Sequence, residues 1–390
     1  MKIAYIGRVT VAELQRKYVF DPPLTSVTCT FGFGNRLIEE LLDRGHSVSV
    51  ITANLPPEKL AFHHSDAMDV YIIPERPRKL EFPTLYSREI AFIHEALNRI
   101  RPDVVLANWT YEFARAALTS GYPTAVVAHD SPWRIFKNNP EISTLFKALY
   151  SQFAVFPRVK HLVVVSPHIE HDMRRLNRYQ GEIAVIPNAL EPTAEDGTQK
   201  EIRQNPHTVV MSSQWMQLKN PKTLIKAFVS LRIRHPDWRL VCYGRGFGKD
   251  EDAERWMRNE GLALDGIEFM GWNHPQAIGR FLFEEADLFC SPTLEESFGM
   301  VFIEAMSRGV PCVGGEKSGA VPWVMGDGGI VCDVSRADTL AECIENVMGD
   351  AELRRRLSAG GRRRVAEMFS IEKVVSMYEA ELQKVFHDNA

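Results

Sequence analysis

Two acidic residues eight positions apart are the first candidates for chemistry in this sequence. Glu296 and Glu304 lie in the stretch SPTLEESFGMVFIEAMSRGVPCVGGEKSG, residues 291–319, which follows a short apolar run typical of a strand. We expect a helix from about Phe298 to Arg308, since Gly309 can end it. If most of the interval is helical, a rise of about 1.5 Å per residue separates the two carboxylates by ~12 Å. Ionised carboxylates accept hydroxyl hydrogen bonds well, so this pair suits the two diols of a nucleotide-sugar.

The start of the same helix offers a site for an anion. The backbone amides of Phe298, Gly299 and Met300 would point toward the place that the acids face. Helix N-termini favour negative charge because their first amides lack partners within the helix. The alternative interpretation is that both acids are solvated residues on a helix surface. Spacing alone does not separate the two interpretations, because acid pairs eight apart arise by chance in a chain with 50 acidic residues.

The context of the acids is more specific than their spacing. The order S-P-T-x-x-E-S-F-G, then E-A-M-S-R-G-V-P, then a glycine-rich loop resembles the family 4 retaining glycosyltransferases of GT-B fold. In that family an E-x7-E donor motif lies between such a loop and such a helix. The resemblance implies that Glu296 holds the donor sugar and Glu304 the ribose, with Ser297 and the amides of Phe298, Gly299 and Met300 around the donor.

Three positions in the second half concern the charge of the donor phosphates. Lys219 begins a helix after a strand, where its ammonium could neutralise a diphosphate. The resemblance implies an Arg five residues earlier, but this chain has Gln214 there. Arg245, in a neighbouring glycine-rich loop, is our candidate for the missing cation. Solvated surface residues are the alternative interpretation for both Lys219 and Arg245.

Two ring-bearing residues complete the donor candidates. His129 ends the apolar strand Thr124–Ala128, where members of the family often carry a His near the donor sugar. A structural hydrogen bond to the adjacent Asp130 is the alternative. Trp272 occupies the place where the family's loop meets the nucleobase, and its π face could stack on the base. An ordinary packing role for Trp272 is the alternative.

A glycine pair near the N-terminus first invites a different interpretation. Gly32-x-Gly34 opens a helix after a strand, as in dinucleotide-binding folds. That fingerprint requires a third glycine where this chain has Leu37, and an acid where it has Ala53 and Asn54. The resemblance explains the pair better, because family members place a glycine-rich turn here against the donor phosphates.

The alternation of strand and helix patterns defines the fold class. Continuous β-branched runs between amphipathic helices predict parallel sheets that are covered on both faces. We therefore predict an α/β chain with two Rossmann-like doubly wound domains, the GT-B arrangement, and an inter-domain cleft. We expect a long loop from Arg8 to about Phe33. The first predicted segment is an N-terminal acceptor-binding domain, residues 1–188, and a linker follows over residues 189–206. A C-terminal nucleotide-sugar-binding domain then spans residues 207–368, and the last segment, residues 369–390, is a helix packing back toward the first domain.

Composition excludes several classes of protein. The chain has 390 residues, 45% of them apolar and 25% charged, with a net charge of −4. This balance argues against a general nucleic-acid binder. The six cysteines form no C-x-x-C pair, no apolar run reaches membrane-spanning length, and the N-terminus reads as a strand, so we expect a cytoplasmic protein. We interpret the acidic run Asp250–Asp252 as a helix cap and solvated face, and we expect neither a metal nor another cofactor.

The predicted reaction moves a sugar from a UDP- or GDP-linked donor to a glycan, lipid-linked or small-molecule acceptor. The resemblance implies retention at the anomeric carbon, no metal, and a leaving phosphate that takes the acceptor proton. His129, Lys219 and Glu296 are the residues that we expect to act in catalysis. Aromatic and basic residues in 18–23 and 131–137 suit the acceptor, and also peripheral contact with the inner face of a membrane. A GT-B sugar-nucleotide epimerase and an inactive nucleotide-sugar binder, motivated by Gln214, are the alternatives.

Overall fold

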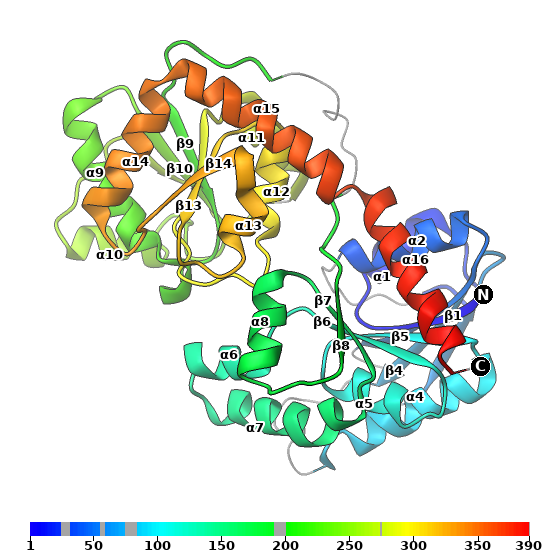
Figure 1. Ribbon diagram of the computed structural model, residues 1–390. Helices are drawn as coiled ribbons and strands as arrows, with labels where there is room; N and C mark the ends of the chain where they lie inside the picture. Colours follow the sequence, from blue (N-terminus) through cyan, green and yellow to red (C-terminus); the bar gives the residue numbers. More distant parts are fainter. Residues whose placement is uncertain (25–31, 55–58, 75–83, 191–199, 274, 390) are drawn as a thin grey trace. The chain divides into compact units, whose positions relative to one another are not determined.

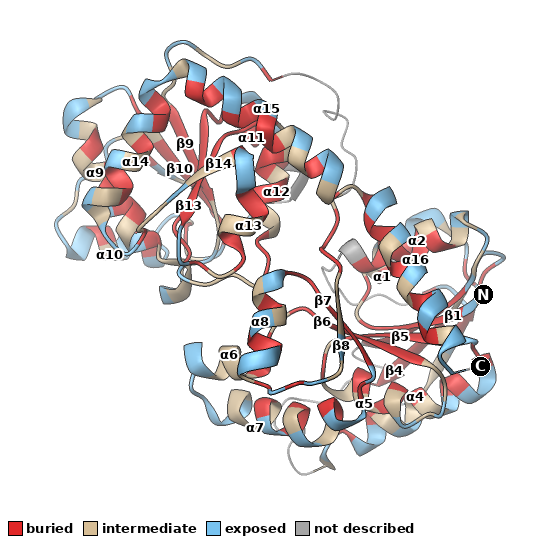
Figure 2. Cartoon of the chain, in the orientation of Figure 1, coloured by how far each residue is buried: buried red, intermediate tan, exposed pale blue. Residues whose placement is uncertain are grey.

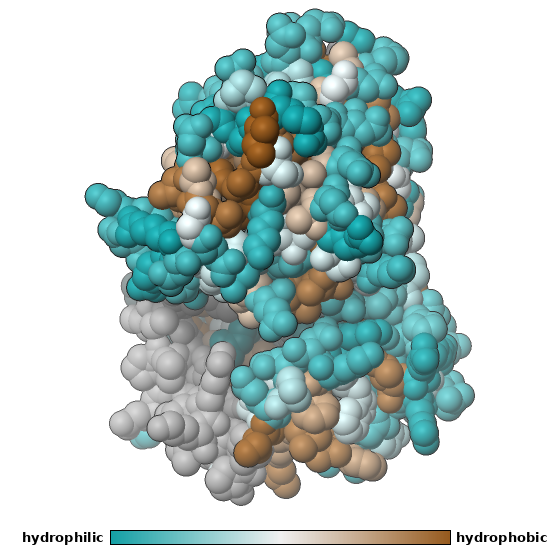
Figure 3. Space-filling model, turned by 90° about the vertical axis from the view of Figure 1, so that its left-hand side faces the viewer, coloured by the Kyte–Doolittle hydropathy of each residue, from teal (hydrophilic) through white to brown (hydrophobic). Residues whose placement is uncertain are grey.

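The chain folds into two compact units, each with its own sheet and core. The computed structural model describes residues 1–24, 32–54, 59–74, 84–190, 200–273 and 275–389. Unit 1 comprises Met1–Glu191 and Ile371–Ala390, and unit 2 comprises Pro192–Ser370 (Figure 1). Buried residues lie inside each unit (Figure 2), and the surface in Figure 3 is mostly hydrophilic with a few apolar patches.

Unit 1 is built on an eight-stranded sheet. From edge to edge the strands are β3 (Ala61–His64), β4 (Asp69–Pro74), β2 (Ser47–Asn54), β1 (Lys2–Ile6), β5 (Val104–Asn108), β6 (Thr124–Ala128), β7 (His161–Val164) and β8 (Glu182–Val185). Neighbouring strands are parallel except the edge pair β3 and β4. Every residue of β5 and β6 is buried, as expected for central parallel strands covered on both faces.

Helices cover both faces of this sheet. Successive apolar side chains of β1 point to opposite faces, so each face needs helices to bury it. The helical segments of unit 1 are α1 (Val11–Lys17), α2 (Gly32–Asp43), α4 (Ser87–Ile100), α5 (Glu112–Leu118), α6 (Pro132–Asn138), α7 (Ile142–Tyr150), η2 (Ser151–Val155), η3 (Phe156–Arg158), α8 (Pro167–Arg175) and α16 (Ile371–His387). Ile3 and Tyr5 join the core formed with α1, α2 and α16. Ala4 and Ile6 join the opposite core, formed with α4 and α5.

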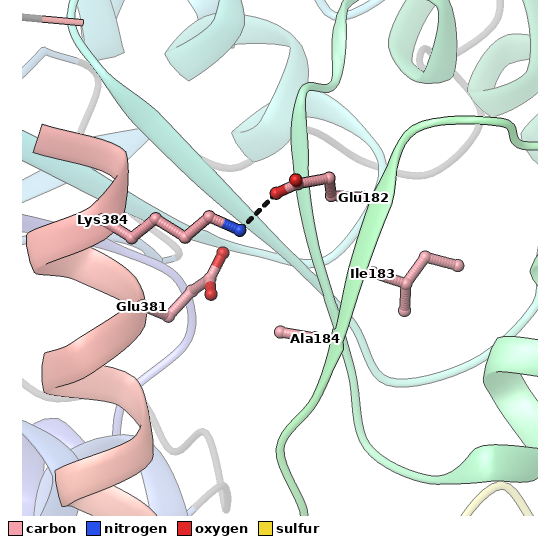
Figure 4. Close-up of a pocket in the computed structure, with 5 residues that line it drawn as sticks. All are labelled: Glu182, Ile183, Ala184, Glu381 and Lys384. Carbon is pink, nitrogen blue, oxygen red and sulfur yellow. Dashed lines mark hydrogen bonds and ion pairs between the residues drawn. The ribbon is translucent and has the colours of Figure 1, made fainter. Parts of the chain in front are cut away.

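The C-terminal helix α16 packs on α2, β5 and β6 of unit 1. Polar contacts reinforce its apolar face: His46 Nε2 lies 2.9 Å from Glu379 Oε1, and Arg44 bonds the other oxygen of that carboxylate at 3.0 Å. Lys384 donates to Glu182 beside a small cavity of about 280 Å³ that Glu381 also lines (Figure 4). The last helix is therefore part of the N-terminal unit.

Unit 2 has a six-stranded, fully parallel sheet. Its strand order is β11 (Ile267–Phe269), β10 (Arg239–Tyr243), β9 (Thr208–Ser212), β12 (Leu288–Ser291), β13 (Cys312–Gly315) and β14 (Gly329–Cys332). The helical segments are η4 (Gln217–Lys219), α9 (Pro221–Arg234), α10 (Asp252–Asn259), α11 (Pro275–Glu284), α12 (Met300–Ser307), α13 (Val321–Met325), η5 (Gly326–Gly328), α14 (Ala337–Gly349) and α15 (Ala351–Met368).

The predicted α/β class with two doubly wound domains is confirmed. One expectation was wrong: the segment after Arg8 is not a continuous loop, because Val11 and Leu14 are buried on one face of α1. The two apolar positions three residues apart allow even this short helix to dock on the core. Half of the predicted linker, residues 191–199, lies outside the described residues. In the described parts of the chain, every helix is too short or too polar to span a membrane.

Candidate functional site

The strand order of unit 2 reverses between β9 and β12. The chain leaves β9 toward β10 and β11 on one side, and returns to β12 on the other. Ligands of open α/β sheets bind at such a reversal, beyond the carboxyl ends of the strands. Lys219 ends η4 after β9, and Glu296 lies in the loop that follows β12. The topology therefore brings together two predicted site residues that are far apart in the sequence.

Lys219 and Glu296 form an ion pair at this point. The Lys219 ammonium donates a hydrogen bond to Glu296 Oε1. The side chains are 28% and 15% exposed respectively, so the pair is sheltered but still reaches solvent. Each charge is thus balanced by the other. A diphosphate that approached Lys219 would compete with a carboxylate already in place.

Hydrogen bonds between loops hold the pair in position. Leu294 N donates to Leu218 O at 2.8 Å, which ties the loop after β12 to the segment before Lys219. Ala320 N donates to Glu296 O at 2.9 Å, and Ser318 Oγ donates to Thr293 O at 2.5 Å. The glycine-rich loop after β13 therefore supports the backbone that carries Glu296.

The helix beside this pair begins later than the sequence predicts. α12 starts at Met300, and Gly299 precedes it with φ 98°, a left-handed conformation that favours glycine. A Cβ at this position would also lie 3.0 Å from the Phe302 ring. Because residues 296–299 are not helical, the helical rise does not give the separation of the two acids. The helix nevertheless directs its N-terminal end toward the loop that carries Glu296.

The remaining residues of this stretch divide into buried and accessible ones. Phe298 is buried, and its ring packs edge-on against Trp323 and Phe369, with centroids 6.2 and 5.4 Å away. Ser297, Met300 and Glu304 are partly exposed. Burial raises the pKa of the Glu304 carboxyl, and the nearby Arg308 opposes this shift. Trp323 also packs edge-on against Phe369, with centroids 5.8 Å apart.

Arg245 and Trp272 form a second pair of predicted site residues. The Arg245 guanidinium lies over the Trp272 ring, 5.3 Å from its centroid. Both side chains are exposed, Trp272 at 59%. Their loops are joined by Gly244 N donating to Gly271 O at 2.8 Å and Gly271 N donating to Phe247 O at 2.7 Å. Arg245 therefore stacks on the indole, and the pair forms an accessible planar surface at the ends of β10 and β11.

One acid has a role that differs from its predicted one. Glu251 was expected to cap a helix and face solvent, and it is exposed and does precede α10, but its side chain makes no cap hydrogen bond. Instead its Oε2 accepts hydrogen bonds from Gly246 N at 2.9 Å and Gly248 N at 2.8 Å. A carboxylate of the chain itself thus occupies the amides of the glycine-rich loop that carries Arg245.

In unit 1, His129 lies in a buried polar cluster at the ends of β5 and β6. Its Nε2 donates to Asn108 Oδ1 at 3.0 Å, so its partner is Asn108 rather than Asp130. Its ring packs against Trp109, with centroids 4.9 Å apart. Burial lowers the pKa of His129 to about 4 and raises that of Asp130 to about 6. His129 is therefore an uncharged imidazole at neutral pH.

Gln214, Gly32 and Gly34 are the remaining predicted positions. Gln214 is an exposed side chain after β9. α2 begins at Gly32. A Cβ at Gly34 would lie 2.5 Å from the Tyr5 hydroxyl and 3.1 Å from Arg8 O, so a glycine is required for the close packing of α2 against β1. Among the described residues, no group of three or more His, Cys, Asp or Glu side chains could hold a metal ion.

Comparisons with known proteins identify the family. The family described as glycosyl transferases group 1 matches residues 193–364, and glycosyltransferase family 4 matches residues 35–194. The chain belongs to the family 4 glycosyltransferases. Its two domains are those of the GT-B fold.

Three similar proteins, distant in sequence, are each covered over 94% or more of their length. An N-acetyl-alpha-D-glucosaminyl L-malate synthase from Bacillus anthracis is 24% identical, with 91% of this chain and 94% of the relative aligned. Sucrose-phosphate synthase from Thermosynechococcus elongatus has a TM-score of 0.74 at 18% identity, with all of both chains covered. Anabaena HepE in complex with UDP and glucose has a TM-score of 0.66 at 16% identity, over 98% of this chain and all of HepE.

The sequence did not predict the contacts of two residues of this glycosyltransferase, Asn108 and Glu251. Asn108 is buried at the end of β5, and its amide nitrogen has no hydrogen-bond partner among the described residues. A polar residue directly after a continuous apolar strand was the available signal. Glu251 was visible only as one acid in a run of three, and nothing in the sequence linked it to Gly246 and Gly248.

Proposed function

We propose that this glycosyltransferase moves a hexosyl group from a UDP-linked sugar to a hydroxyl acceptor, with retention at the anomeric carbon and without a metal ion. A GDP-linked donor is the variant of this proposal that shares the same phosphate chemistry. The acceptor is a glycan, a lipid-linked sugar or a small polyol. The single observation that carries the proposal is the Lys219–Glu296 ion pair at the strand-order reversal of unit 2.

The pair offers one group to each part of an activated sugar. The Lys219 ammonium can move from Glu296 to the diphosphate and neutralise charge that grows as the bond to the sugar breaks. Glu296, partly released, can accept hydrogen bonds from sugar hydroxyls. The amides at the start of α12 add fixed positive potential near the same loop. In this proposal the departing phosphate takes the acceptor proton, and no side chain acts as a nucleophile.

The neighbouring loops supply the nucleoside end of the same proposal. The stacked Arg245 and Trp272 present a planar, accessible surface on which a uracil ring could stack. Glu304, partly exposed on α12, remains our candidate for the ribose hydroxyls. His129 is assigned to the donor sugar as a neutral hydrogen-bonding ring, because a buried imidazole of low pKa carries no charge at neutral pH.

A donor panel tests the proposal. UDP-glucose, UDP-N-acetylglucosamine and GDP-mannose are each incubated with the protein in the presence of a chelator, and release of UDP or GDP is followed. UDP-N-acetylglucosamine belongs in the panel because the Bacillus anthracis relative is named for an N-acetylglucosaminyl product. We expect turnover of one UDP-sugar with the chelator present. The anomeric coupling in the product, read by NMR, decides between retention and inversion.

The exposed Gln214 favours one second candidate, an inactive nucleotide-sugar binder. Where the resemblance implies a cation, this side chain carries no charge, so the diphosphate has one fewer positive partner. Binding of UDP-sugars without hydrolysis or transfer would support that candidate. A Gln214→Arg variant that gained turnover would show directly that this position limits the activity.

A further inference from the structure

Two cysteines of unit 2 lie on neighbouring elements beside one apolar core. Cys332 is the last residue of β14, and Cys343 lies in the second turn of α14. The strand and the helix pack against each other (Figure 1). Both side chains are partly buried against the same core, and both thiols are free.

The periodicity of the two elements places both thiols between the strand and the helix. On β14, Cys332 shares a face with Ile330, which also packs against this core. On α14, Cys343 lies three residues after Leu340 and four before Val347, and both of these are completely buried. A hydrogen bond between the two thiols, together with burial, raises the pKa of Cys332. The two sulfur atoms are therefore neighbours.

The other cysteines of the described residues are closed to solvent. Cys242, Cys290 and Cys312 are completely buried in unit 2. Burial raises the pKa of each of these thiols, which disfavours the thiolate, the form that reacts with oxidants. Cys332 and Cys343 are each partly exposed, so an oxidant from solution can reach them.

We propose that Cys332 and Cys343 form an oxidation site, where hydrogen peroxide converts the two thiols to a disulfide between β14 and α14. The Cys343 thiolate attacks one peroxide oxygen and becomes a sulfenic acid, and the released hydroxide takes up a proton to form water. The Cys332 sulfur then attacks the Cys343 sulfur, loses its proton and displaces the hydroxyl group as a second water. Two thiols are thereby oxidised, and one hydrogen peroxide is reduced to two waters.

The order of these steps follows from the surroundings of the two thiols. The raised pKa of Cys332 keeps that thiol protonated, so the first attack falls to Cys343. A thiol that donates a hydrogen bond to its neighbour also stabilises the neighbour's thiolate. Cys332 is thus the resolving thiol, already in position when the sulfenic acid forms.

The end of β14 links this site to the loops at the strand-order reversal. Cys332 O accepts a hydrogen bond from Glu316 N at 2.9 Å, in the glycine-rich loop after β13. Two residues later, Val334 O accepts from Asn220 Nδ2 at 2.7 Å, and Asn220 directly follows Lys219. A disulfide draws its two sulfur atoms to about 2.05 Å, so the end of β14 moves relative to these two partners. Oxidation should therefore loosen the loops that we assign to the donor.

Peptide mapping after oxidation tests the proposal on the full-length protein. The protein is treated with hydrogen peroxide, its remaining thiols are alkylated, and trypsin then cuts after Arg336, between the two cysteines. We expect a pair of peptides joined through Cys332 and Cys343, which a reducing agent separates. Cys29 lies outside the described residues, so the mapping must identify both partners of the bond. Absence of this pair, or a bond from either cysteine to a different one, would overturn the proposal.

Single variants test the order of the two steps. In Cys332→Ser the reaction should stop at the sulfenic acid of Cys343, which a sulfenic-acid trapping reagent captures. In Cys343→Ser we expect little trapping at Cys332. Cys312→Ala is the control, because this buried thiol takes no part, and its disulfide yield should equal that of the wild type. Equal trapping in both serine variants would overturn the assigned order.

Hydrogen exchange and UDP binding measure the effect on the loops. In the oxidised protein we expect exchange at the Glu316 amide to be about tenfold faster. We expect the affinity for UDP to fall by about two- to tenfold, the effect of losing one hydrogen bond. Unchanged exchange would overturn the link to the loops. The UDP effect rests on the proposed function, but the disulfide does not. Failure of the reduced protein to bind any UDP-sugar would therefore count against the proposed function alone.

Discussion

The two sheets of this glycosyltransferase end in opposite electrostatic environments. At the reversal of unit 2, Lys219 and Glu296 form an ion pair and remain partly exposed. At the ends of β5 and β6 in unit 1, His129 and Asn108 are buried and share an uncharged hydrogen bond. Both regions lie at the carboxyl ends of parallel strands, yet one holds an ion pair and the other a neutral hydrogen bond.

The difference in burial explains why one pair is charged and the other neutral, and it decides which pair can balance a charged ligand. Taking a charged group out of water is costly, so a buried His stays neutral while a sheltered ion pair that still reaches solvent stays charged. A neutral imidazole cannot balance a diphosphate. In the proposed reaction, the donor phosphates are met by Lys219 and the N-terminal end of α12. His129 and Asn108 carry no charge and can offer only hydrogen bonds.

We expect the largest effect from removing the ammonium of Lys219, the positive member of the Lys219–Glu296 pair and therefore the one that can bind a phosphate. Lys219→Ala should lower kcat about 100- to 1,000-fold, because a preorganised cation is lost and the Glu296 carboxylate is left to repel the donor. Lys226→Ala is the control, since Lys226 is 52% exposed and only distantly paired with Glu260, at 3.8 Å. Steady-state kinetics with the best donor of the panel measures both variants. A Lys219→Ala enzyme with nearly normal kcat would remove the contrast between the two units.

The buried side of the comparison predicts a pH dependence of stability. The folded pKa of His129, about 4, lies below its ordinary value of 6.5, so the unfolded chain binds the extra proton. The stability associated with His129 is therefore present above pH 6.5 and lost as pH falls through 4. For Asp130 the folded pKa, about 6, lies above the ordinary 3.8, so its contribution is present below 3.8 and lost as pH rises through 6. The two slopes oppose each other between pH 4 and 6.

Single variants should expose each slope. Relative to the wild type, His129→Gln loses the His129 slope, so the difference in its free energy of unfolding should fall as pH rises from 4 to 6. Relative to the wild type, Asp130→Asn loses the Asp130 slope, so the difference should rise over the same range, by up to about 3 kcal/mol. Urea unfolding at a series of pH values measures both. Parallel curves for the two variants would show that these groups are not buried as the structure has them.

The strength of the local sequence pattern explains which helices and strands could be predicted. The bounds of β6, Thr124–Ala128, agree with the predicted range. This strand is a strong local pattern, a continuous apolar run. α1 was missed because seven residues with two buried positions give a weak pattern. The antiparallel β3 was missed because only one of its four residues is buried.

The site was predictable as a set of residues but not as pairs. The motif around Glu296 and the position of Lys219 were visible, yet 77 residues separate them, and only the pairing of β9 with β12 brings them together. The role of Glu251 depends on the backbone path of Gly246 and Gly248, which no side-chain pattern records. Arg245 was predicted as a phosphate partner, and that role stays a prediction, since the guanidinium lies on Trp272.

A smaller effect should follow from loosening the loop that Glu251 holds. Glu251→Ala removes an acceptor of two backbone hydrogen bonds, each worth about 1.5–3 kcal/mol at most when charged. We expect faster hydrogen exchange at the amides of Gly246 and Gly248 and a roughly 10-fold weaker affinity for UDP, because Arg245 is carried on this loop. Glu254→Ala is the control on the same helix, since Glu254 accepts from Asp250 N and Arg258 instead. Unchanged exchange at both glycines would contradict the anchoring role.

The smallest effect concerns the planar surface of Arg245 and Trp272. A cation–π contact at an exposed site is worth about 0.5–1 kcal/mol, so Arg245→Gln should change UDP affinity only about two- to fivefold. The direction is informative. If the base stacks on the outer face of the guanidinium, affinity falls; if it needs the indole face that Arg245 covers, affinity rises. Arg245→Lys separates the effect of the planar guanidinium from that of the positive charge, because Lys keeps the charge but has no planar group. We expect affinity to fall in both variants, measured by calorimetry with UDP. A fall in Arg245→Gln alone would show that charge suffices and would bring this part of unit 2 back to the phosphate role first predicted for it.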